Sequence, residues 1–127
     1  MAVRDGDLLF LSGHGAFDDG RPVHVGRLGE TMTTAQGMRA ADAVTRSLLA
    51  TVRAELGDLS KVDRVLKVVV FVNSTPDFTE QHLVADGATD LLVTVFGEAG
   101  RPARSAIGVA ALPLGFAVEI EAVIRIA

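Results

Sequence analysis

The chain has 127 residues, a net charge of −4 and no cysteine. The missing cysteine excludes disulfides, thiolate metal sites and cysteine nucleophiles. The negative charge, together with six phenylalanines and no tryptophan or tyrosine, argues against a nucleic-acid-binding protein, which needs a basic surface and aromatic stacking platforms.

Length and sequence complexity predict a single domain. No linker, repeat or low-complexity tract divides residues 1–127, and a chain of this size can bury one core. Residues 1–7 are charged and turn-like rather than typical of a signal peptide, and no segment approaches the length needed to cross a bilayer. We therefore expect a soluble cytoplasmic protein with one domain over residues 1–127 and no membrane partner.

The first half of the chain predicts two strands and one long helix. Residues 8–11 are typical of a short buried strand, and Asp18-Asp19-Gly20 of a hairpin turn that leads to a weak second strand over residues 22–25. Thr33 or Thr34 can cap a helix that runs to about Leu56 and ends at Gly57. Apolar residues recur in this helix at spacings of three and four, which predicts one face packed on a sheet.

The second half predicts a strand over residues 65–72, a helical region over about residues 78–96, and two final strands over residues 102–109 and 118–124. We expect an interruption of the second helix near Asp86-Gly87, because glycine weakens a helix interior. The resulting order is ββαβαββ, which predicts an α+β fold with both helices on one face of the sheet.

The strand over residues 65–72 also predicts self-association. Both of its faces are apolar apart from Lys67, so both should be covered in the folded protein. Two helices cover only one face of a sheet, and the chain offers no second layer for the other. Another copy of the chain is the simplest cover, so we expect an oligomer.

Charged residues on the last two strands are the first site candidates. Arg104 lies on an otherwise apolar segment, and Glu119 and Glu121 share one face of the next strand because side chains alternate. Residues 112–115 form a plausible turn, so we expect the two strands to pair as an antiparallel hairpin that brings Arg104 and Glu119 toward the same end of the sheet. On spacing alone Glu119 and Glu121 are equivalent, and a structural ion pair of Arg104 with either one, across an interface, is the alternative.

The chemistry of these groups suits a small carboxylate ligand. A guanidinium offers a planar fork of donors that matches a carboxylate, and a nearby acid can activate a water molecule. The three histidines, His14, His24 and His82, show no metal-ligand spacing, so no metal site is expected. Ser105 is predicted to be a hydrogen-bonding strand residue, since no histidine lies close to it in the sequence.

These segments together resemble the RidA (YjgF) family, also called the endoribonuclease L-PSP family. The resemblance covers nearly the whole chain and rests on four segments in the family's order: Leu9-Phe10-Leu11-Ser12-Gly13, Val70-Phe71-Val72, Pro102-Ala103-Arg104-Ser105 and Glu119-Ile120-Glu121. It implies a chorismate-mutase-like fold, a homotrimer with ligand clefts between subunits, and cofactor-free hydrolysis of enamines and imines, such as 2-iminopropanoate and 2-iminobutanoate, to a keto acid and ammonia.

The resemblance also assigns roles to individual residues. It implies that Arg104 holds the substrate carboxylate and that Glu119 activates water. The substrate-binding candidates are Ser12, Gly13, His14, Arg104 and Ser105.

The sequence departs from the family's pattern at several positions. Many active deaminases carry a cysteine at the position of Ala106, a glutamate at the position of Gly108, and a tyrosine before the first strand, whereas this chain contains no tyrosine. These departures favour an alternative, a non-catalytic trimer that binds a small carboxylate metabolite or a protein partner. A third hypothesis is an enzyme of specialised metabolism that acts on another electrophilic carbonyl or imine.

Overall fold

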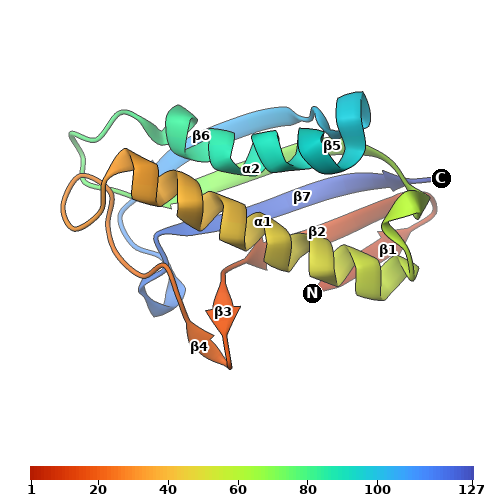
Figure 1. Ribbon diagram of the computed structural model, residues 1–127, viewed down its shortest axis with the longest axis horizontal. Coiled ribbons are helices and arrows are strands. Elements are labelled where there is room, and N and C mark those ends of the chain that lie inside the picture. Colours follow the sequence, from red (N-terminus) through yellow and green to blue (C-terminus); the bar gives the residue numbers. More distant parts are fainter.

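A mixed five-stranded sheet carries two helices on one of its faces in the computed structural model, which describes residues 1–127 (Figure 1). The strand order is β1-β2-β7-β5-β6, and β5 and β6 are the one parallel pair. A separate hairpin is formed by β3 and β4. The elements are β1 (Ala2–Asp5), β2 (Leu8–His14), β3 (Phe17–Asp18), β4 (Arg21–Pro22), α1 (Thr34–Leu56), β5 (Val62–Asn73), α2 (Gln81–Phe96), β6 (Ala103–Val109) and β7 (Val118–Ile126), with short 3₁₀ turns at Leu59–Lys61, Gly97–Gly100 and Pro113–Gly115.

The boundaries predicted for α1 are confirmed. Thr33 is the N-cap, and its hydroxyl accepts a hydrogen bond from the Gln36 backbone N–H at 3.2 Å. The Gln36 side chain in turn accepts from the Thr33 N–H at 2.8 Å, which completes a capping box. At the other end Gly57 has φ of 87°, and its N–H donates to the Arg53 carbonyl.

The predicted interruption of α2 is wrong, because the helix runs without a break past Gly87. The glycine serves helix packing instead. A Cβ atom at position 87 would lie 2.1 Å from the backbone oxygen of Met38 in α1, so only glycine allows this close approach. The helix also begins at Gln81, three residues later than the sequence pattern indicates.

The prediction for the N-terminal strands needs correction. Residues 2–5, whose sequence predicts a charged turn, form the edge strand β1 against β2. The weak strand expected over residues 22–25 does not join the main sheet, since β4 ends at Pro22 and pairs only with β3. Proline has no backbone N–H to donate, which limits such a segment to a short edge.

The expected hairpin between the last two strands is also wrong, because β5 lies between β6 and β7. β5 pairs in parallel with β6 and antiparallel with β7. The segment from β5 through α2 to β6 is therefore a βαβ unit, in which a helix supplies the crossover that parallel strands require. The connection that contains Pro113–Gly115 then carries the chain past the end of β5 into β7.

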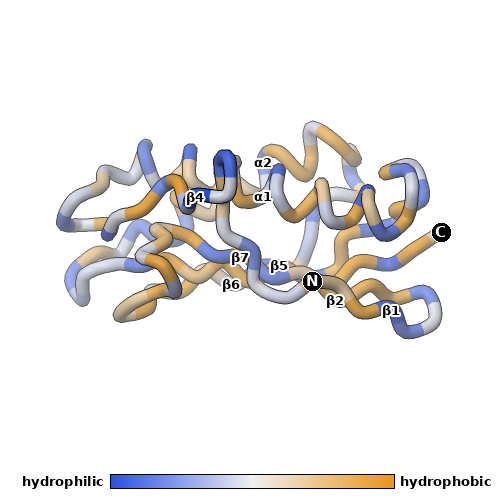
Figure 2. The backbone as a smooth tube through the Cα atoms, turned by 90° about the horizontal axis from the view of Figure 1, so that it is seen from below, coloured by the Kyte–Doolittle hydropathy of each residue, from blue (hydrophilic) through white to orange (hydrophobic).

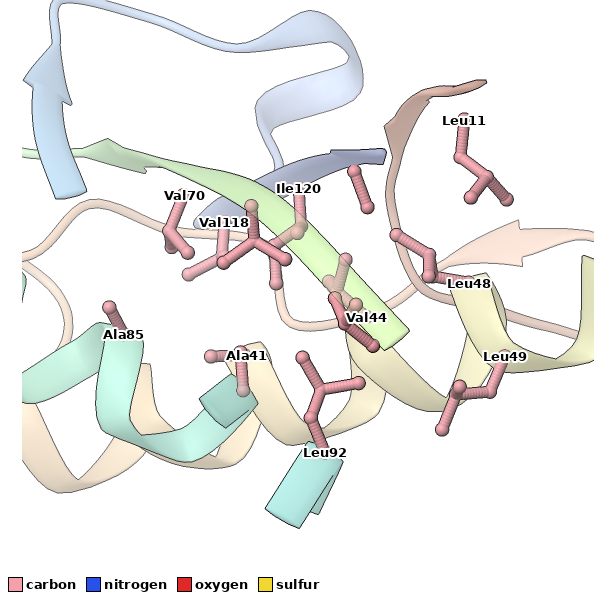
Figure 3. Close-up of a cluster of buried hydrophobic side chains, with 14 of the residues drawn as sticks. Leu11, Ala41, Val44, Leu48, Leu49, Val70, Ala85, Leu92, Val118 and Ile120 are labelled. Carbon is pink, nitrogen blue, oxygen red and sulfur yellow. The ribbon is translucent and has the colours of Figure 1, made fainter. Parts of the chain in front are cut away.

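The core lies between the sheet and the two helices, as Figure 3 shows for part of it. The inner face of β7 is the uninterrupted apolar row expected from the sequence, and all its members are buried: Val118, Ile120, Ala122, Ile124 and Ile126. Val44 from α1 and Leu92 from α2 belong to the same buried cluster and are at most 2% exposed. The prediction that both helices pack on one face of the sheet is confirmed.

The opposite face of the sheet has no covering layer within the chain, as Figure 2 shows. Val3, Phe10 and Ile107 lie on this open face and are 60%, 43% and 44% exposed. On β5 itself, Val69 and Phe71 lie on this open face and are partly exposed, so both faces of β5 are apolar as expected and one of them is uncovered in the single chain. Neither α1 nor α2 has the combination of length and apolar composition that a membrane-crossing helix requires.

Candidate functional site

Arg104 lies on the helix-facing side of the edge strand β6. Its register partner in β5 is Val68, which is 1% exposed and faces the helices. The Arg104 side chain, 26% exposed, reaches α2, where Nη1 donates to Asp86 Oδ1 at 2.8 Å and to Thr89 Oγ1 at 3.1 Å. The arginine is thus held by the helix that covers it, and Nε and Nη2 have no hydrogen-bond partner in the chain.

A cleft of about 310 Å³ opens beside this arginine. It lies where the last turns of α2 face the start of β6, and its lining is mainly polar. The residues are Thr89, Asp90, Val93, Arg101, Pro102 and Arg104. A planar carboxylate that entered this cleft would meet the free donors of Arg104.

Glu119 lies on the other face of the sheet, above β2. A Cβ atom at Gly13 would lie only 2.7 Å from the Cδ atom of Glu119, so the carboxylate rests directly on the glycine backbone. Gly13 is part of an irregularity in the pairing of β2 with β7 between Leu11 and His14. Glu119 makes no ion pair within the chain. Ser12, Gly13 and Glu119 therefore gather at one end of the open face.

The single chain does not bring Arg104 and Glu119 together. Arg104 pairs with Val68 of β5, and Glu119 pairs with Phe71 of β5. Val68 and Phe71 are three residues apart on one strand, so they and their partners point to opposite faces of the sheet. The expectation that both site residues meet at one end of the sheet within a hairpin is therefore corrected. Within one chain, Arg104 and Glu119 lie on opposite faces of the sheet.

Ser105 and Ser12 both lie on the open face rather than with Arg104. The Ser105 hydroxyl accepts a hydrogen bond from Lys67 Nζ at 3.1 Å, and the Ser12 hydroxyl donates to the Met1 carbonyl at 3.2 Å. Ser12, Lys67 and Glu121 line a mainly apolar hollow of about 340 Å³ on this face. Ser105 is thus a hydrogen-bonding strand residue, as its sequence context predicts.

His14 is buried between β2 and α1, with 8% of its surface exposed. Its Nδ1 lies 2.6 Å from the Ser12 carbonyl oxygen and its Nε2 lies 2.9 Å from Thr51 Oγ1. A carbonyl only accepts, so Nδ1 donates and the neutral ring uses Nε2 to accept from the Thr51 hydroxyl. Burial lowers the pKa of His14 below its ordinary value, and the hydrogen bond to Ser12 acts in the opposite direction. Both ring nitrogens make hydrogen bonds within the chain, so His14 has no free group to offer a substrate and is not part of the proposed site.

The buried His14 gives a pH dependence with a defined sign. The unfolded chain takes up a proton on this ring as the pH falls through about 6.5, whereas the folded chain keeps the ring neutral to lower pH. The free energy of unfolding is therefore expected to fall with the pH below about 6.5. Urea denaturation over a pH series should show this loss in the wild type and a smaller one in His14→Gln, which does not titrate. An equal pH dependence of the free energy of unfolding in the two proteins would contradict this role of His14.

Sequence reasoning missed the partners of Arg104. The sequence pattern of residues 86–90, which include Asp86 and Thr89, favours a helix break or cap and gives neither residue a role beside Arg104. Asp86 and Thr89 are three residues apart, which places both side chains on one face of α2. This spacing is the only feature of the sequence that indicates a shared partner for them. Two further positions near Arg104 carry no functional group, since Ala106 and Gly108 share its face of β6.

Comparison with known proteins identifies the family. The family model described as Endoribonuclease L-PSP matches residues 1–126. The chain belongs to the endoribonuclease L-PSP (RidA) family. The protein TCP17 of Trypanosoma cruzi is 46% identical over 125 residues, which cover 98% of this chain and 78% of that protein.

Solved structures share the fold of this chain. Atu1372 from Agrobacterium tumefaciens, described as a protein with unknown function, is 44% identical with a TM-score of 0.97 and coverage of 99% of this chain and 80% of that chain. RidA from the Antarctic bacterium Psychrobacter sp. PAMC 21119 is 28% identical and has a TM-score of 0.65. The match covers 98% of this chain and 85% of that chain. The RidA-like α+β fold predicted from the sequence is confirmed.

Proposed function

We propose that this RidA-family chain is an imine and enamine deaminase, which hydrolyses small 2-imino acids such as 2-iminopropanoate and 2-iminobutanoate to 2-keto acids and ammonia. The proposed site forms between subunits of a cytoplasmic homotrimer and uses no cofactor. Arg104 comes from one copy of the chain, and Glu119, with Ser12 and Gly13, comes from the next.

The free edge of the Arg104 guanidinium is the observation that carries the proposal. Nη1 is taken by α2, whereas Nε and Nη2 remain available at the margin of the cleft. Parallel N–H groups on one edge of a guanidinium bind a carboxylate through two hydrogen bonds, which fixes both its position and its orientation. A 2-imino acid held in this way presents its C=N group at a defined distance from the arginine.

The separation of Arg104 and Glu119 within one chain supports a site formed between two copies of the chain. Arg104 lies on β6, at the edge of the sheet, so a neighbouring chain can approach it. Glu119 lies on the open face, which exposes apolar side chains such as Phe10 and Ile107. Burying such a face against another copy is energetically favourable, and a head-to-tail arrangement would juxtapose the edge of one chain with the open face of the next.

The proposed reaction needs only water as a second reactant. Glu119 accepts a proton from a water molecule, whose oxygen adds to C2 of the imine, and the C=N electron pair moves to nitrogen. Protonation of that nitrogen, with the carboxyl group of Glu119 as the acid, gives a carbinolamine with an amine leaving group. Glu119 then takes the hydroxyl proton and returns a proton to the amino group, so that the C2–N bond breaks, ammonia leaves and the oxygen electron pair completes the C2 carbonyl. No oxidation or reduction takes place.

A steady-state assay with 2-iminopropanoate, generated in situ by an amino-acid oxidase, tests this function. We expect the wild type to hydrolyse the imine faster than buffer does. Arg104→Ala should lower kcat/KM about a hundredfold, because the carboxylate loses a charged, bidentate partner. Glu119→Gln should lower kcat about a hundredfold or more, because an amide is not a base at neutral pH. Arg46→Ala, which removes an exposed arginine of α1, is the control and should leave both constants unchanged.

A carboxylate-binding protein without catalysis is the second candidate. Ala106 and Gly108 favour it, because the strand that carries Arg104 offers no further reactive side chain. The space next to Gly108 is filled by Ser74 and Gln81, since a Cβ atom at position 108 would lie 2.7 Å from Ser74 Oγ and 2.9 Å from Gln81 Nε2. A wild type that fails to accelerate hydrolysis, yet binds pyruvate in a manner abolished by Arg104→Ala, would contradict the deaminase and support this candidate.

A further inference from the structure

The guanidinium of Arg104 is held through a single nitrogen atom. Nη1 uses its two N–H groups on Asp86 Oδ1 and Thr89 Oγ1. The Thr89 hydroxyl points its own hydrogen toward the Ala85 carbonyl at 3.4 Å, so its oxygen is free to accept from the arginine. Three of the five N–H groups of Arg104, one on Nε and two on Nη2, are left without a partner in the chain.

The helix that carries these two acceptors is itself fixed in place. Gly87, next to Asp86, brings α2 so close to α1 that a Cβ atom there would lie 2.1 Å from the Met38 backbone oxygen. Asp86 and Thr89, three residues apart, face the same side of the helix. The contact between α1 and α2 therefore fixes the distance of Asp86 and Thr89 from β6. Because both residues accept hydrogen bonds from Arg104, this distance also fixes the position of its guanidinium.

We infer that Asp86 and Thr89 are positioning residues for Arg104, which occupy Nη1 and present the Nε–Nη2 edge to the carboxylate of the substrate. This inference rests on the proposed function of Arg104. A long arginine side chain loses much rotational freedom when it binds a ligand, and prior fixation by α2 removes part of that cost. The aspartate also leaves the arginine only one edge that can bind a carboxylate through two hydrogen bonds.

The opposite role for Asp86 makes a different prediction. If its carboxylate competed with the substrate for the guanidinium, removal of Asp86 would strengthen substrate binding. If it positions the guanidinium, removal weakens substrate binding through a raised KM, and kcat changes little because the carboxylate contact is equal in the ground state and the transition state.

The experiment compares four variants in the 2-iminopropanoate assay. Asp86→Ala should raise KM about tenfold or more, since a hydrogen bond to a charged group is lost, and kcat should change less than about threefold. Thr89→Val, which keeps the side-chain shape, should raise KM by a smaller factor, and Asp86→Asn should restore part of the loss because its oxygen still accepts. Asp42→Ala is the matched control: Asp42 is also 40% exposed and also pairs with an arginine, Arg46, at 2.7 Å, but on the outer surface of α1.

A spectroscopic readout separates positioning from general destabilisation. The Nε–H resonance of Arg104, assigned by its loss in Arg104→Ala, should be sharp in the wild type and broadened or shifted in Asp86→Ala and Thr89→Val, but unchanged in Asp42→Ala. A KM equal to that of the wild type in both Asp86→Ala and Thr89→Val, or a lowered KM, would overturn the inference while Arg104→Ala still supports the proposed function. An unchanged KM in Arg104→Ala would instead overturn the proposed function.

Discussion

Replacing Gly87 by alanine is expected to lower the free energy of unfolding by about 2–3 kcal/mol. The added methyl group would meet the backbone of α1, 2.1 Å from the Met38 oxygen, and a backbone atom cannot turn aside as a side chain can. The loss is expected even though alanine favours a helix over glycine by about 1 kcal/mol, because that gain is smaller than the cost of separating two packed helices.

Denaturant unfolding monitored by circular dichroism measures this effect. Gly37→Ala is the informative comparison, since Gly37 lies in α1 at the same contact between helices. A Cβ atom there would meet side-chain atoms of Leu28 and Val84 at 2.8 Å, and these can shift by small rotations. We expect a smaller loss for Gly37→Ala than for Gly87→Ala. A Gly87→Ala protein as stable as the wild type would show that α2 is not fixed in the way described.

The elements whose residues act locally could be predicted from the sequence. Thr33 and Gly57 mark the two ends of α1 because capping depends on a few neighbouring residues. The alternation in β7 predicts which face is buried, since side chains on a strand alternate whatever lies beside it. The capping contacts of Thr33 and Gly57 confirm the first expectation, and the burial of Ile120 and its neighbours on the same face confirms the second.

The strand order could not be read from neighbouring segments alone. Consecutive strands pair often enough that a hairpin of β6 and β7 was the natural expectation, but β5 is apolar on both faces and takes the position between them. The signal that predicts this was present: a strand, a helix and a strand in succession form a βαβ unit whose two strands are parallel. Applied to residues 62–109, the rule places β6 beside β5.

The sequence predicts which residues belong to the candidate site better than it predicts how they are arranged. The sequence predicts Arg104 and Glu119 as site residues because charges on apolar strands need a partner or a role. Their placement on opposite faces follows from the position of β5 between β6 and β7, which no local pattern of the sequence predicts. The contact of Arg104 with Asp86 joins a strand to a helix distant in sequence, and such a contact depends on the packing of α2 rather than on any local pattern.

The separation of Arg104 and Glu119 leads to the second large effect, recovery of activity when two inactive variants are mixed. Arg104→Ala and Glu119→Gln should each be about a hundredfold or more less active than the wild type when assayed alone. In a mixed oligomer, a cleft that takes its arginine from a Glu119→Gln chain and its acid from an Arg104→Ala chain is intact. Random equal mixing in a closed head-to-tail ring gives both intact partners in about a quarter of the clefts.

The control mixture combines Arg104→Ala with the double variant Arg104→Ala/Glu119→Gln. No chain in this mixture carries Arg104, so no cleft is complete and no activity should return. Formation of mixed oligomers is checked independently in both mixtures by co-purification of two differently tagged chains.

The measurement that tests the account most directly is therefore the rate of 2-iminopropanoate hydrolysis after Arg104→Ala and Glu119→Gln chains are unfolded and refolded together. We predict that about a quarter of the wild-type rate returns, with no return in the control mixture. Mixed oligomers that form and yet remain as inactive as the separate variants would contradict a site shared between two copies of the chain.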